Sequence, residues 1–143
     1  MVPDVNNMRL VFDTCNMEYF EGKLLFPQFE VMHSFRKCGL FKYTTGGWSD
    51  KTMYDPVILM TDYFDFTEDQ FVNVMCHEMI HYYLAYCGID TKCSHGKQFM
   101  EKANHLNEKY GLNIQVKTDI STLKPRKGAP LLGYWLHHLY FMP

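Results

Sequence analysis

The sequence lacks the cysteine pattern of a disulfide-stapled or ribbon-type domain. Its five cysteines are an odd set, and no two of them form a CxxC pair. An odd set cannot be fully paired, and a zinc ribbon or knuckle needs CxxC pairs, so the pattern argues against both classes of domain. Reduced thiols are typical of the cytosol, and we therefore predict a cytoplasmic protein.

Long apolar runs and an excess of basic charge are also missing. The N-terminus has neither the basic nor the apolar region of a signal peptide, and the apolar stretch 131–142 is short and broken by His137 and His138. The formal net charge of −2 gives no general attraction to nucleic acid or anionic lipid. We expect no membrane association, and any nucleic-acid binding must come from a local patch.

What is present is sufficient for one folded domain. The chain has 143 residues, of which 47% are hydrophobic and 16% aromatic, so it can bury a core. Apolar residues at helical spacing predict helices, and short apolar runs bounded by turn residues predict strands. The expected helices cover 5–20, 68–87 and about 96–110, the expected strands cover 29–35, 40–43 and 57–60, and 114–116 is expected to add an edge strand. This order predicts an α+β fold with a small antiparallel or mixed sheet.

The C-terminal part differs in charge from the rest. Residues 117–143 hold four basic residues and one acidic residue. The segment 124–130 is typical of an exposed linker, because it is rich in proline, glycine and basic residues. We therefore describe 119–143 as a basic linker followed by an apolar tail. Lys124, Arg126 and Lys127 could contact DNA phosphates, although basic residues in a linker are more often simply solvated.

The residues that carry chemistry lie in the second predicted helix. This helix contains His77-Glu78-Met79-Ile80-His81, an HExxH motif whose two histidines are four residues apart and project from one face. Two such imidazoles can share a metal ion, and a Zn²⁺ with three protein ligands keeps its fourth position for water. Glu78 can reach that water as a general base. Thr67 and Gln70 form a capping box that supports the helix the motif requires.

The third metal ligand lies outside the motif. A metzincin extension would require glycine and histidine where this chain has Leu84 and Cys87, so that class is excluded. Two candidates remain, His95 at the start of the third helix and Glu101 within it, and the spacing of Glu101 is similar to that of thermolysin-like enzymes. We favour His95, because Gly96 after it would let the backbone approach the neighbouring helix closely.

The combination of motifs resembles a known family. HExxH at 77–81 followed by His95-Gly96-Lys97-Gln98-Phe99, with residues 19–24 upstream, looks like the SprT-like metalloprotease domain of bacterial SprT proteins and eukaryotic Spartan. The similarity covers about residues 8–118, and we assign 1–118 to this domain. It implies a zincin-like fold, in which the HExxH helix packs against a small sheet together with two further helices.

The resemblance also implies a function. It implies one Zn²⁺ per chain bound by His77, His81 and His95, with Glu78 as the catalytic residue, and hydrolysis of peptide bonds in protein substrates. Spartan relatives degrade proteins trapped on DNA, often with a zinc ribbon after the protease domain. This chain has no cysteine after Cys93, so DNA-associated substrates are the weaker expectation. The alternative hypothesis is a catalytically silent or autoinhibited zinc-bearing module that binds protein partners, with the apolar tail covering its site.

Overall fold

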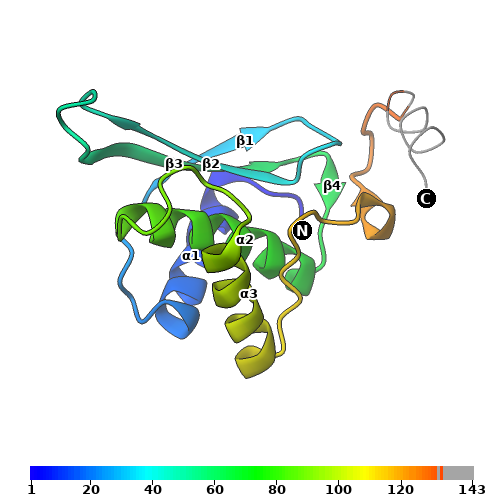
Figure 1. Cartoon of the computed structure of the whole chain (residues 1–143). Coiled ribbons are helices and arrows are strands. Elements are labelled where there is room, and N and C mark those ends of the chain that lie inside the picture. Colours follow the sequence, from blue (N-terminus) through cyan, green and yellow to red (C-terminus); the bar gives the residue numbers. More distant parts are fainter. Residues whose placement is uncertain (132, 134–143) are drawn as a thin grey trace.

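The chain folds into helices packed on one side of a small sheet. A computed structural model describes residues 1–131 and residue 133. Its helices are α1 Val5–Tyr19, α2 Glu68–Tyr86, α3 Lys97–Tyr110 and a 3-10 turn at Ile120–Thr122, and its strands are β1 Gln28–Met32, β2 Gly39–Thr45, β3 Met53–Thr61, β4 Phe64–Asp65 and β5 Lys124–Pro125. The long helices lie beneath the sheet of β1, β2 and β3 (Figure 1). This arrangement confirms the predicted α+β fold.

Local interactions define the helix ends at the predicted places. The Asp4 carboxylate accepts a hydrogen bond from the Asn7 N–H, and the Thr67 hydroxyl accepts one from the Gln70 N–H, so α1 and α2 both begin with a capping box. Gly111 ends α3 with a φ of 68°, a left-handed conformation that favours glycine. Within the described part of the chain, no helix is both long and apolar enough to cross a membrane.

The three-stranded sheet is mixed, with β3 in the centre. β3 pairs antiparallel with β2, to which a hairpin joins it, and parallel with β1. The sheet is therefore the mixed one of the two predicted arrangements, because β3 inserts between two strands that follow each other in sequence. Alternation of apolar residues shows which side chains face the core, but it does not identify the neighbouring strand. This order leaves β2 at one edge of the sheet.

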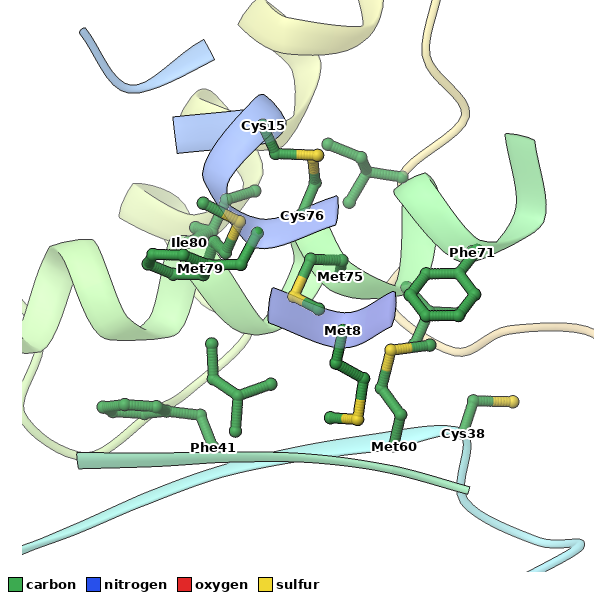
Figure 2. Packing of buried hydrophobic residues seen from close by; sticks show 14 of the residues in the cluster. Met8, Cys15, Cys38, Phe41, Met60, Phe71, Met75, Cys76, Met79 and Ile80 are labelled. Carbon is green, nitrogen blue, oxygen red and sulfur yellow. The ribbon is translucent and has the colours of Figure 1, made fainter. Parts of the chain in front are cut away.

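The core lies between the sheet and the helices. Met8 of α1, Met75 of α2 and Met60 of β3 are fully buried and point into the same space (Figure 2). Burial of each such side chain contributes about 1.5–3 kcal/mol. α2 contacts α1, α3, β2 and β3, and more than half of its residues are buried. It is therefore the central element, and its side chains are held by packing on several sides.

The predicted edge strand at 114–116 is absent. The Asn107 side chain donates a hydrogen bond to the Ile114 carbonyl at 3.1 Å and accepts one from the Ile114 N–H at 2.8 Å. The Asn113 N–H donates to the Asn73 side chain at 3.0 Å. Side chains of the helices thus satisfy backbone groups that a strand would pair with another strand, so the segment runs along α2 and α3 without joining the sheet.

The segment expected to be an exposed linker is partly built into the fold. Residues 124–125 form β5, which pairs antiparallel with β4. The Arg126 N–H donates to the Tyr63 carbonyl at 2.7 Å, and Ala129 is buried. These contacts attach the segment to the fold, although Lys124 and Lys127 are exposed, and the division into 1–118 and 119–143 stays a prediction. The apolar tail after Gly133, including His137 and His138, lies outside the described residues.

Candidate metal centre

The HExxH motif lies in the second half of α2. His77 and His81 are one helical turn apart, and their ring centroids are separated by 5.1 Å. His81 is 5% exposed, whereas His77 is half-buried. Because α2 packs against two helices and two strands, both imidazoles project from a rigid support towards the same point.

His95 joins this pair from a different segment. It precedes Gly96, the N-cap of α3, and its Nε2 lies 3.1 Å from Nε2 of His77 and 3.1 Å from Nε2 of His81. One ligand atom from each histidine lies within 4.8 Å of the other two. Nitrogen atoms bound at about 2.0–2.1 Å to one tetrahedral zinc ion are roughly 3.3 Å apart. The three imidazoles can therefore hold a single metal ion.

The protonation of the histidines also suits a cation. Burial lowers the pKa of His77 and of His81 to about 4, so both imidazoles are neutral at pH 7. The Nδ1–H of His77 donates to the Gln115 carbonyl at 2.7 Å, which leaves the lone pair on Nε2. Nδ1 of His81 is buried and has no hydrogen-bond partner among the described residues. Neutral imidazoles whose Nε2 atoms face one another are the donor set that a divalent cation requires.

The alternative third ligand lies elsewhere. The side chain of Glu101 is 66% exposed, and its Oε1 lies 3.9 Å from Nζ of Lys97 on the outer face of α3. The structure therefore brings His95 to the motif and leaves Glu101 out. We favoured His95 because Gly96 was expected to allow a close approach to the neighbouring helix, and this reason is wrong. A Cβ added to Gly96 would meet only the Ser94 hydroxyl, at 3.4 Å, and no atom of the neighbouring helix.

Glu78 is buried against the start of β2. Glu78 is 5% exposed, and this burial raises the pKa of its carboxyl group to about 8. The positive charge of Lys37 lowers the same pKa by a smaller amount. A Cβ added to Gly39 would lie 2.7 Å from Oε2 and 3.0 Å from Cγ of Glu78. Glycine at position 39 therefore permits the observed position of the carboxylate. This role of Gly39 was missed from the sequence, although a glycine at a strand is a known signal of close approach.

A cavity of about 370 Å³ gives access to these groups. Its lining includes the three histidines, Glu78, the first residues of β2 and the segment 116–118. β2 is an edge strand, so the backbone groups on its outer edge are not paired with another strand of the sheet. The first residues of this strand line the cavity. Concave sites with a few convergent polar groups are typical of ligand binding and catalysis.

A comparison with protein families agrees with this arrangement. The model of the SprT-like family matches residues 8–118, a range that contains β1, β2, β3, α2 and α3. The chain belongs to the SprT-like family. This confirms the predicted resemblance over the range that was expected for it. None of the curated proteins compared with the chain matches it.

Phe99 gives the second SprT-like motif, HGxxF, a physical role. Its ring is fully buried, and its centroid lies 4.8 Å from those of His77 and His81 and 4.9 Å from that of His95. One aromatic ring thus contacts all three imidazoles and restricts their orientations. From the sequence, Phe99 was recognised only as part of the motif, since its contacts depend on how α3 packs on α2.

The SprT-like site does not include the basic residues near the C-terminal end of the described chain. Lys124 lies in β5, and Arg126 and Lys127 follow it. None of these three residues lines the cavity. Their predicted contact with DNA stays a prediction.

Proposed function

We propose that the chain is a zinc-dependent metallopeptidase that hydrolyses peptide bonds in protein substrates. The observation that supports this most strongly is the convergence of three histidines in the same cavity as the buried Glu78. Three imidazole ligands are typical of zinc sites that keep a position open for water or substrate. His77, His81 and His95 would hold one Zn²⁺ per chain.

Glu78 would transfer the proton in this reaction. When bound, zinc supplies a Lewis acid that polarises a carbonyl group and lowers the pKa of a water molecule. Burial alone favours the protonated form of Glu78, but a neighbouring divalent charge favours its carboxylate. The carboxylate accepts a proton from the attacking water and then donates it to the leaving amine. The products are a new carboxylate end and a new amino end.

The edge of β2 offers a way to place the substrate. β2 begins at Gly39, whose backbone lies against Glu78, and its outer edge is not paired within the sheet. An extended polypeptide can add to such an edge through backbone hydrogen bonds, which do not depend on its sequence. A peptide bound in this way would present its carbonyl groups beside the three histidines.

Replacement of Glu78 by glutamine tests the proposal. The amide keeps the size of the side chain but removes the proton acceptor, so zinc content should stay at the wild-type level while cleavage of casein falls by about 10²-fold or more. Glu101→Gln is the matched control, since Glu101 is exposed on α3.

Two results would contradict the proposal. Casein cleavage by Glu78→Gln at the wild-type rate would exclude the proton-transfer role. A zinc-loaded wild-type chain that cleaves none of a panel of unfolded proteins would favour the catalytically silent binding module.

A further inference from the structure

Three cationic side chains line the same cavity as the three histidines. They are Arg36 and Lys37, from the loop between β1 and β2, and Lys117, from the segment after α3. All three are exposed, and Glu78 is the only acidic residue among the described residues that line the cavity. The chain as a whole has a net charge of −2, so the wall of this cavity differs in sign from the rest of the molecule.

Hydrogen bonds hold the backbone close to all three cations. The Ser34 hydroxyl accepts hydrogen bonds from the N–H groups of Arg36 and Lys37, both at 3.1 Å. Lys117 follows Gln115 by two residues, and the Gln115 carbonyl accepts the hydrogen bond from His77. Two segments about 80 positions apart in the sequence therefore bring positive charge to one cavity.

None of the three cations forms a close ion pair in the described part of the chain, although the charge of Lys37 acts on the Glu78 carboxyl from within the same cavity. No ion pair there involves Arg36, Lys37 or Lys117. The guanidinium of Arg36 lies 5.5 Å from the centre of the Phe35 ring, a contact that leaves its charge uncompensated. The cavity thus presents three positive charges to whatever enters it.

We propose that Arg36, Lys37 and Lys117 form a subsite that selects protein substrates with an acidic side chain close to the scissile peptide bond. This inference rests on the proposed peptidase function. A cavity of about 370 Å³ admits peptide side chains but is too small for a nucleic-acid duplex, so an acidic peptide is favoured over duplex DNA as its occupant. A solvent-exposed charge pair changes binding by about 1.4- to fivefold, so an acidic side chain that gains about twofold from each of three cations is preferred by roughly tenfold.

Matched peptides test the subsite directly. We would measure kcat/KM of the zinc-loaded full chain on fluorogenic peptides that differ only in having Glu, Gln or Lys at positions up to three residues from the cleaved bond. The wild type should prefer Glu over Gln by roughly tenfold at one or more positions, and salt should weaken the preference. Arg36→Gln, Lys37→Gln and Lys117→Gln should each lower the Glu-to-Gln ratio, and the triple variant should abolish it.

Lys51→Gln is the control variant. Lys51 is exposed in the hairpin between β2 and β3, it does not line the cavity, and the Glu-to-Gln ratio should be unchanged when it is replaced. A wild-type ratio near one at every position would overturn the subsite while leaving the peptidase intact. Retention of the wild-type ratio in the triple variant would overturn the subsite as well.

A second readout separates the subsite from the peptidase function. If no peptide is cleaved, the proposed function fails, and fluorescence anisotropy of the same peptides on zinc-loaded Glu78→Gln then decides the subsite. The subsite is supported if Glu78→Gln binds the Glu peptide more tightly than the Gln peptide, and if this difference disappears when Arg36, Lys37 and Lys117 are also replaced by glutamine. Equal binding of the Glu and Gln peptides overturns it. Binding of a single-stranded oligonucleotide that depends on the three cations, without any preference for Glu, would assign them to nucleic acid instead.

Discussion

Replacement of Gly39 by alanine tests whether the close approach of β2 sets the position of Glu78. The added Cβ would lie 2.7 Å from Oε2 of Glu78, whereas ordinary van der Waals contact begins at 3.4 Å. The carboxylate must therefore move by roughly 0.7 Å, and a shift of about 1 Å in a reacting group can cost a hundredfold in rate. We expect kcat/KM to fall by about 10- to 100-fold, or about 1.4–2.7 kcal/mol in activation free energy.

The assay must separate this displacement from a loss of metal or fold. The three atoms nearest to the added Cβ all belong to Glu78, so the zinc content of Gly39→Ala should equal that of the wild type. Gly96→Ala is the control, because a Cβ there meets only the Ser94 hydroxyl at an ordinary distance of 3.4 Å, and activity should be retained. Wild-type activity in Gly39→Ala would refute the reasoning. A parallel loss of zinc would show that the effect does not act through Glu78.

Two further predictions concern stability. In the metal-free protein, burial raises the pKa of Glu78 to about 8 from 4.5, so its contribution to stability is complete below pH 4.5 and is lost as the pH rises to about 8. Urea denaturation at about pH 5 and pH 8 should therefore show metal-free Glu78→Gln gaining stability relative to the wild type at the higher pH, and a constant difference would contradict this. Asn16→Ala should lower the free energy of unfolding by about 1–3 kcal/mol, because the Asn16 amide bonds both the N–H and the carbonyl of buried Leu24. An unchanged urea midpoint would exclude this role.

Features that depend on nearby residues could be predicted from the sequence. The capping box of Thr67 and Gln70 and the four-residue spacing of His77 and His81 act within one helix, so no knowledge of the tertiary structure was needed. His95 required a choice between two candidates fourteen and twenty residues away, which spacing alone left open. The structure brings His95 to the motif because α3 packs on α2 with Phe99 beneath all three imidazoles.

Features that depend on distant segments could not be predicted in this way. The parallel pairing of β1 with β3 requires β3 to insert between successive strands, and an alternating pattern carries no information about strand order. The contact of Gly39 with Glu78 joins residues from two elements. Ile114 was expected in an edge strand, yet the Asn107 side chain satisfies its backbone instead.

The most direct test of the proposed metal centre is the zinc content per chain, measured by elemental analysis after purification without added metal. We expect one zinc ion in the wild type and in Glu101→Ala, and a large loss in His95→Ala, because among residues 1–131 and 133 only His95 completes the histidine cluster. Loss of zinc in Glu101→Ala with retention in His95→Ala would contradict the proposed site. A wild-type chain that binds no zinc even after reconstitution would contradict the metallopeptidase itself.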